Sequence, residues 1–250
     1  MVAVDGPSGS GKSSAARGAA SALGLRYLDT GAMYRAVTWW MLEHDVDLAD
    51  TGAVAGHTME LSIDISTDPQ AQWIRVDGID VSAEIRQRRV SNVVSLVAAV
   101  PEVRAQLVGQ QRAIIAAALV AGGIVAEGRD IGTVVAPDAP VKVYLTASEQ
   151  VRAERRAAEM AGRQVGRGAV SQPEAARGVS DSRVAVPADS SQEAAPSPAV
   201  TRAEQAQRDR RDAPQSQMAG DAIEIDATDL GLDDVIGRIV GLVVAKRAGG

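Results

Sequence analysis

Cysteine is absent from this chain of 250 residues, and only two histidines occur, His44 and His57. Without cysteine the protein can form no disulfide bond, no cysteine-ligated metal site and no thiol nucleophile. Two histidines also provide few candidate residues for a histidine-rich metal site or for a catalytic triad of serine, histidine and aspartate. Phenylalanine is missing as well, and no aromatic residue follows Tyr144, so the C-terminal part of the chain must build its core from aliphatic side chains.

Positive charge is in deficit, because 26 lysines and arginines stand against 32 aspartates and glutamates, for a net charge of −6. A protein whose main task is to grip nucleic acid or an anionic membrane usually has the opposite sign. Long apolar runs are also lacking, since the longest, residues 113–126, contains two glycines and is too short to cross a bilayer. The N-terminus shows no secretion signal. We therefore expect a cytoplasmic protein that binds neither nucleic acid nor membranes.

Short apolar segments alternate with longer helical patterns along most of the chain. The segments that predict strands are Val2–Asp5, 27–29, 124–126, 141–145 and 222–226. The segments that predict helices are Lys12–Leu23, 33–44, 101–121, 148–161, 201–212 and 233–246. Strands that alternate with helices are typical of a parallel sheet covered by helices. The sequence therefore predicts an α/β fold.

Two regions depart from this alternation. Residues 61–81 alternate apolar and polar side chains with a period of two around turn residues, which predicts an antiparallel β insertion. Residues 163–200 hold four of the ten prolines among Ser, Ala, Gly and Gln and show no periodicity, which predicts a mobile loop. The predicted division of the chain is a core (1–56, 87–150 and 218–250), an insertion (57–86) and a lid region (151–217) that includes the loop.

A glycine-rich loop follows the first predicted strand. Residues 6–13 fit the pattern G-x-x-x-x-G-K-[ST] without a mismatch, with a strand before them and a helix after them. The backbone N–H groups of such a loop surround an anion, the helix N-terminus adds positive charge, and the Lys12 amine reaches the β- and γ-phosphates. The predicted ATP-binding residues are Gly6, Pro7, Ser8, Gly9, Ser10, Gly11, Lys12, Ser13 and Ser14.

Two residues are candidates for contact with the Mg²⁺ that accompanies ATP. Ser13 offers a hydroxyl to the ion, and Glu127, at the end of a predicted strand, could act on it through water. Glu127 could equally be a surface carboxylate at a strand end, and the sequence leaves both alternatives open. A GTP-binding switch is excluded, because its guanine-reading N-K-x-D element needs an asparagine before lysine, and a valine follows the only asparagine, Asn92.

A small kinase must also bind an acceptor substrate, and arginines in suitable places are present. Arg35 lies one turn into a predicted helix, and Arg129 lies just beyond the C-terminal end of a predicted strand, where open α/β sheets bind ligands. Three more share one predicted helix, where their heads can converge on a phosphate chain, and a fourth lies in a further basic set: Arg152, Arg155, Arg156 and Arg208. The alternative for these helix arginines is a solvated face with acidic neighbours.

Four motifs resemble those of the bacterial cytidylate (CMP) kinases, which are P-loop nucleoside monophosphate kinases. The motifs are DGPSGSGKS (5–13), LDTGAMYR (28–35), DVSAEIR (80–86) and VAEGRDIGTVVAPDAPVK (125–142), and the resemblance covers residues 1–160 and 201–245. It implies a three-layer α/β/α P-loop fold with a central parallel sheet. It also implies that the β-rich insertion binds the monophosphate and that the lid is mobile.

The resemblance implies a CMP site with a part for each portion of the nucleotide. The expected phosphate contacts are Arg35 and Arg129, and the expected contacts to the cytosine edge are Ser95, Arg104 and Asp130. Arg208 and Asp212 are expected near the ribose and the phosphates, and Thr30 also belongs to the site. One position departs from the family pattern. Gln215 stands where family members usually carry a further arginine.

These residues predict transfer of the γ-phosphoryl group of ATP to CMP or dCMP, with Mg²⁺ as cofactor, in an enzyme that the resemblance implies is a monomer. The acceptor is already a phosphate oxygen, mostly ionised at pH 7, so no general base is required. The residues expected to hold the transferring group are Lys12, Arg152, Arg155, Arg156 and Arg208. The alternatives are a related kinase acting on UMP, AMP or shikimate, and a non-catalytic ATP-binding sensor module.

Overall fold

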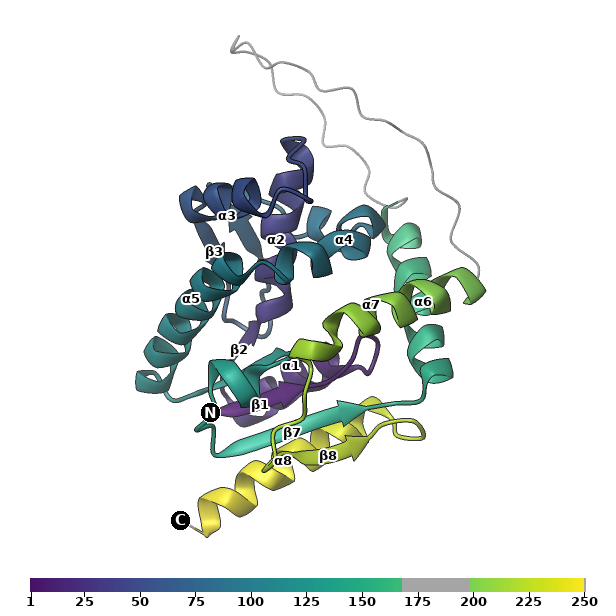
Figure 1. Ribbon diagram of the computed structural model, residues 1–250. Coiled ribbons are helices and arrows are strands. Elements are labelled where there is room, and N and C mark those ends of the chain that lie inside the picture. Colours follow the sequence, from purple (N-terminus) through teal and green to yellow (C-terminus); the bar gives the residue numbers. More distant parts are fainter. Residues whose placement is uncertain (168–197, 250) are drawn as a thin grey trace, which may run out of the picture.

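The computed structural model describes residues 1–167 and 198–249, and a parallel sheet lies at its centre (Figure 1). The strand order is β2-β6-β1-β7-β8, and each neighbouring pair runs parallel. The strands are β1 (Val2–Asp5), β2 (Arg26–Asp29), β6 (Ile124–Gly128), β7 (Val141–Thr146) and β8 (Ile223–Asp226). Every strand predicted for the core is present, and the predicted parallel sheet is confirmed.

Helices cover both faces of this sheet. The side chains of each strand alternate between the faces, so both faces carry apolar residues that the helices bury. Val2 and Val4 belong to the aliphatic core on one face, whereas Ala3 belongs to the core on the other. The helices are α1 (Lys12–Leu23) and α8 (Leu232–Ala248) on the first face, and α2 (Thr30–Glu43) and α5 (Pro101–Val120) on the second. This is the three-layer α/β/α arrangement that the motifs implied.

Local signals set the end of α1 and the start of α2. Helix α1 ends at Leu23 and is capped by Gly24, whose φ of 64° lies in the left-handed region that favours glycine. Helix α2 begins at Thr30 rather than at the predicted residue 33, because the Asp29 carboxylate accepts a hydrogen bond from the Ala32 amide (2.9 Å) and caps the helix. Asp29 is thereby fixed at the junction between β2 and α2.

Helices α3 (Thr51–Glu60) and α4 (Arg88–Ala98) are additional to the predicted elements. The sequence holds signals for both of them. The Asp50 carboxylate caps α3 by accepting a hydrogen bond from the Ala53 amide at 3.0 Å. On α4 a buried valine stripe follows the helical period, at positions 90, 94 and 97. Helix α4 is important for the site, because it carries Ser95 to the sheet's carboxyl edge.

A second, antiparallel sheet lies within the predicted insertion. Its strands are β3 (Ile63–Ile65), β4 (Ile74–Val76) and β5 (Ile79–Asp80), and the short helical turn η1 (Glu84–Arg86) follows them. Asp77 and Gly78 form the tight turn from β4 to β5 with φ values of 50° and 80°. The antiparallel strands are confirmed, whereas the division of the chain into core, insertion and lid stays a prediction.

Helices α6 (Glu149–Arg167) and α7 (Pro198–Asp212) lie against each other, and the short turn η3 (Ala213–Gln215) continues α7 toward β8 (Figure 1). The predicted loop at 163–200 is wrong at both ends, because 163–167 extend α6 and 198–200 begin α7. Arg163 and Gln164 favour helix, and Pro198 fits the first helical position. Residues 168–197 lie outside the described part. Among the described residues, no helix is long and apolar enough to cross a membrane.

Candidate active site

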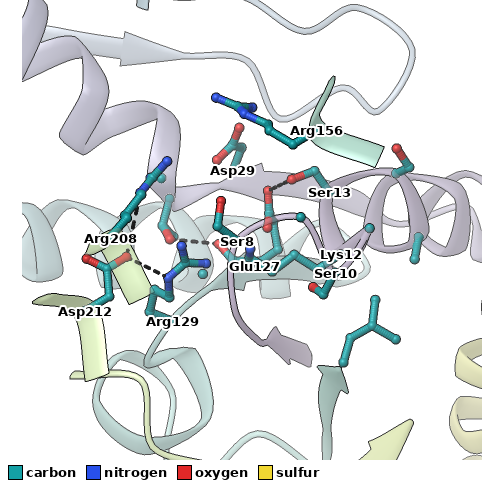
Figure 2. A pocket seen from close by; sticks show the side chains of 18 of the residues that line it. Ser8, Ser10, Lys12, Ser13, Asp29, Glu127, Arg129, Arg156, Arg208 and Asp212 are labelled. Atoms are coloured by element: carbon teal, nitrogen blue, oxygen red, sulfur yellow. Dashed lines mark hydrogen bonds and ion pairs between the residues drawn. The ribbon is translucent and has the colours of Figure 1, made fainter. Parts of the chain in front are cut away.

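The carboxyl ends of β1, β2 and β6 meet at one edge of the sheet, and a cavity of about 430 Å³ opens there (Figure 2). This edge is where open α/β sheets bind ligands. Side chains from α1, α2, α4, α5, α6 and α7 line the cavity. It brings together all the residues predicted for the site except Gly6, Pro7 and Arg152, which do not line it. The roles of these residues in binding stay predictions.

Glycines allow the loop between β1 and α1 to wrap tightly against the sheet. Gly9 and Gly11 have φ values of 78° and 91°, which side chains with a Cβ rarely adopt. A Cβ on Gly6 would lie only 2.2 Å from the carbonyl oxygen of Leu145 in β7. The φ of Gly6, at 151°, is also one that side chains with a Cβ rarely adopt, so the loop needs glycine at all three positions for its backbone conformation and at Gly6 for close packing as well.

Lys12 lies in the first turn of α1, and its Nζ donates a hydrogen bond to the Pro7 carbonyl oxygen at 3.1 Å. Burial, followed by repulsion from Arg129, lowers the pKa of Lys12 to about 7. A bound anion would favour the charged ammonium, because it would offset both effects. The loop is thus electrostatically suited to a phosphate chain.

Glu127 is buried at the end of β6, with 2% of its surface exposed. Its Oε1 accepts hydrogen bonds from the Ser13 hydroxyl (2.6 Å) and the Tyr27 hydroxyl (3.2 Å), while Thr30 Oγ1 donates to its carbonyl oxygen (2.7 Å). Burial, and then the charge of Asp29, raises the pKa of Glu127. The alternative of a surface carboxylate is therefore wrong, and the predicted neighbours Ser13 and Glu127 are in direct contact.

Arg35 and Arg129 both pair with acidic side chains at the cavity. Arg35 Nη2 lies 2.8 Å from an Asp29 carboxylate oxygen. Arg129 Nε lies 3.1 Å from Asp212 Oδ2, and its Nη1 donates to the Gly6 carbonyl oxygen at 2.8 Å. Burial, the largest single influence, would raise the pKa of Asp29, but the charges of Arg35 and Arg86 and the hydrogen bond from the Ala32 amide together hold that pKa below its ordinary value. These pairs fix two guanidinium groups that line the cavity.

Two buried guanidinium nitrogens have no hydrogen-bond partner among the described residues, namely Nε of Arg35 and Nε of Arg208. The Nε of Arg208 lies 3.7 Å from Asp212 Oδ2, which is an ion-pair distance but too long for a hydrogen bond, and Arg129 contacts the same carboxylate oxygen (Figure 2). Burial, and then repulsion from Arg129, lowers the pKa of Arg208 to about 9. Arg129 and Arg208 share one carboxylate, and Arg35 and Arg208 each keep a guanidinium nitrogen without a hydrogen bond, so this group of cations is suited to a further anion.

Arg104 and Asp130 form an ion pair on the side of the cavity formed by α5. Arg104 Nη1 also donates to Gln215 Oε1 at 2.9 Å. Ser95, predicted for the same part of the site, instead donates its hydroxyl to Asp212 at 2.7 Å. The structure thus joins Arg104 with Asp130, and it joins Ser95 to the carboxylate that also binds Arg129.

The three arginines of α6 have different partners. Arg152 Nη1 donates to the Ser8 carbonyl oxygen at 2.9 Å, and Arg155 Nη1 donates to a second carbonyl oxygen of the loop at 3.2 Å. Arg156 Nη2 donates across the cavity to the Ser91 hydroxyl of α4 at 3.1 Å. Arg152 and Arg155 therefore hold the phosphate loop through its carbonyl oxygens, and the three arginine heads do not converge on one point.

Three residues take part in the site without having been predicted there. Asp29 pairs with Arg35 and Tyr27 contacts Glu127, whereas Asp209 accepts a hydrogen bond from the Ser8 amide (3.4 Å). An acidic residue between a strand and a helix was the available signal for Asp29. The contacts of Tyr27 and Asp209 span 100 and 201 residues of sequence, so no local pattern indicated them.

A glycine-rich loop that is suited to an anion lies between a strand and a helix, and it lines the same cavity as several arginines. This combination is characteristic of a P-loop phosphotransferase. The family model for cytidylate kinase matches residues 2–194. A cytidylate kinase of Rhodococcus opacus is 47% identical over 249 residues, which cover 100% of this chain and 96% of that protein. A cytidylate kinase of Streptomyces avermitilis is 43% identical over 248 residues, covering 99% and 94%. The chain belongs to the cytidylate kinase family, as its motifs predicted.

Proposed function

We propose that this protein transfers the γ-phosphoryl group of ATP to CMP or dCMP, producing ADP and CDP or dCDP. The observation that carries the proposal is a cavity with an anion-binding loop on one side and the cations Arg35, Arg129 and Arg208 on the other. Two phosphate-bearing ligands that face each other across the cavity would satisfy both sides. A sensor that only bound ATP would have no use for the second side.

Mg²⁺ is part of the proposal, as an ion that arrives with the phosphates of ATP. In the described part of the chain, no three His, Asp or Glu side chains are grouped so that they could hold a metal by themselves. The Ser13 hydroxyl would bind the ion, and Glu127, 2.6 Å from that hydroxyl, would act through water. The bound ion would neutralise charge on the phosphate oxygens.

The chemistry requires positioning more than proton transfer. The second pKa of a phosphate monoester is about 6, so the acceptor oxygen of CMP is ionised at neutral pH and needs no base. Arg35 and Arg129 would bind the acceptor phosphate, while Lys12 and Arg208 would neutralise the charge on the transferring group. Ordered pairs with Asp29 and Asp212 keep two of these cations in place before the ligands bind.

The base would be read by Arg104 and Asp130. The carboxylate can accept a hydrogen bond from the N4 amino group of cytosine, and the guanidinium can donate to the N3 and O2 acceptors. Uracil would instead turn its O4 acceptor toward the carboxylate and leave that buried oxygen unpaired. A site that leaves a buried polar group unpaired rejects the wrong base strongly.

The test is an ADP-release assay with ATP and a panel of acceptors, namely CMP, dCMP, UMP, AMP and GMP, with Lys12→Ala as a variant expected to have much lower activity. We expect the largest kcat/KM with CMP or dCMP. A preference for UMP or AMP would assign a different acceptor. Tight ATP binding without turnover on any acceptor would overturn the proposal in favour of a sensor module.

We further propose that the enzyme works as a monomer in the cytoplasm and needs no nucleic acid partner. The net charge of −6 agrees with the last point. Light scattering coupled to size exclusion should give the mass of a single chain, and a mass of two chains would refute the proposal of a monomer.

A further inference from the structure

The guanidinium group of Arg104 is held from two sides. Its Nη2 pairs with Asp130 Oδ2, and its Nη1 donates to Gln215 Oε1 at 2.9 Å. Asp130 is buried, and the Arg104 side chain is 20% exposed. Because a guanidinium is a rigid planar fork, two partners on its two terminal nitrogens fix both its position and the orientation of its plane.

Gln215 is well placed to fix that plane. It is half-buried at the end of η3, and its Nε2 lies 3.5 Å from the Ala98 carbonyl oxygen at the end of α4. Three residues earlier, Asp212 accepts hydrogen bonds from Ser95 (2.7 Å) and Arg129 (3.1 Å). One turn of chain after α7 therefore contacts both the arginine assigned to the base and the arginine assigned to the acceptor phosphate.

The amide of Gln215 is chemically suited to this task. Its oxygen accepts from Arg104 without adding a second carboxylate to the ion pair, so the charge of Arg104 stays balanced by Asp130 alone at this point. Without Gln215, the Arg104 guanidinium would be held only through its Nη2 by Asp130, and it could rotate about that single contact. The hydrogen-bond donors offered to the base would then lose their fixed direction.

We propose that Gln215 is a positioning residue that orients Arg104 for recognition of the pyrimidine edge and thereby contributes to the choice of CMP over UMP. The inference rests on the proposed function, since it refines the base pocket of the same site. It assigns to Gln215 no contact with the transferring phosphoryl group. The residue should therefore act on the acceptor's KM and on base discrimination, and kcat should change little.

The experiment compares Gln215→Ala with Gln215→Glu, which keeps an acceptor oxygen at the same reach, and with Gln217→Ala, which alters an exposed neighbour. Loss of one hydrogen bond to a charged group predicts that Gln215→Ala raises the KM for CMP about tenfold and lowers the CMP-over-UMP ratio of kcat/KM about fivefold. We expect kcat within about threefold of wild type, a scale well below that of losing a catalytic contact. Gln215→Glu should recover most of the KM, and Gln217→Ala should match wild type.

Thermal unfolding of the same variants separates positioning from mere support of the fold. A lower Tm for Gln215→Ala with an unchanged KM and an unchanged CMP-over-UMP ratio would overturn the inference, and so would an equal loss in the control at position 217. A wild-type enzyme that is inactive on CMP would overturn the proposed function together with this inference. Active wild type with an unaffected Gln215→Ala variant would overturn the inference alone.

Discussion

Asp5 ends β1 with its carboxylate inside the protein, where one oxygen accepts from the Ile131 amide (2.8 Å) and the other from the Gly132 amide (2.7 Å). These amides belong to the short π-helix η2 (Ile131–Val135), which directly follows the site residues Arg129 and Asp130. Burial is the largest influence on this carboxyl. It raises the pKa of Asp5 from 3.8 to about 6, against the opposing effect of the two amides.

The sign of the resulting pH dependence follows from linkage. The folded protein holds the Asp5 proton more tightly than the unfolded chain, so the stability contributed by this group is complete below pH 3.8 and is lost as the pH rises through 6. The shift corresponds to about 3 kcal/mol in total, of which about 2 kcal/mol falls between pH 4.5 and pH 7.5. Asn at position 5 does not titrate, so Asp5→Asn should lack this loss.

The assay is urea unfolding of wild type and Asp5→Asn at several pH values between 4.5 and 7.5. The amide of Asn faces one backbone N–H with a donor, which adds a pH-independent penalty of about 1–3 kcal/mol. The difference in unfolding free energy between the two proteins should therefore move by about 2 kcal/mol in favour of the variant as the pH rises. A difference that stays constant over this range would refute the reasoning.

A control carboxyl should behave in the opposite sense. Asp226 is exposed, and hydrogen bonds from the Thr228 hydroxyl and amide lower its pKa. Any stability that it contributes is present at neutral pH and is lost on acidification. Asp226→Asn should therefore show no gain in relative stability as the pH rises. A gain equal to that of Asp5→Asn would show that the effect does not belong to the buried site.

Three further changes test the site. Lys12→Ala should lower kcat/KM by at least about thirtyfold, the equivalent of 2–4 kcal/mol for one oriented charge, and activity within threefold of wild type would contradict its role. Gly6→Ala would place a methyl group 2.2 Å from the Leu145 carbonyl oxygen, so its free energy of unfolding in urea should fall by about 2 kcal/mol or more; an unchanged midpoint would mean that the loop shifts freely. Asp130→Asn should lower the CMP-over-UMP ratio by about tenfold, and an unchanged ratio would locate base recognition elsewhere.

The first and last residues of the helices show how well local sequence patterns predict where a helix begins and ends. Helix α1 ends at Leu23 as predicted, because the backbone freedom of the next residue, Gly24, allows the left-handed conformation that ends the helix. The start of α2 was placed three residues late, since the capping contact between Asp29 and Ala32 has no apolar signature. The loop expected at 163–200 was too long at both ends, because a low apolar content does not prevent an arginine-rich helix from continuing.

The burial of Glu127 is a feature that only the tertiary structure could decide. The sequence placed it at a strand end beside the magnesium site and left open whether it was buried or exposed. Burial of the strand and the hydroxyls of Ser13 and Tyr27, 114 and 100 residues away in sequence, decided the question. The same holds for Asp212, which joins Ser95 and Arg129 across 117 and 83 residues.

The sequence by itself determined the phosphate loop, the alternation of strands and helices in the core apart from α3 and α4, and the family, because each of these depends on residues that are neighbours along the chain. The tertiary structure decided which carboxylate balances each arginine, which arginines brace the loop and which face the cavity. It also decided that Gln215 meets Arg104. These are contacts between distant segments, and their partners are selected by the packing of the sheet and its helices, which no local spacing encodes.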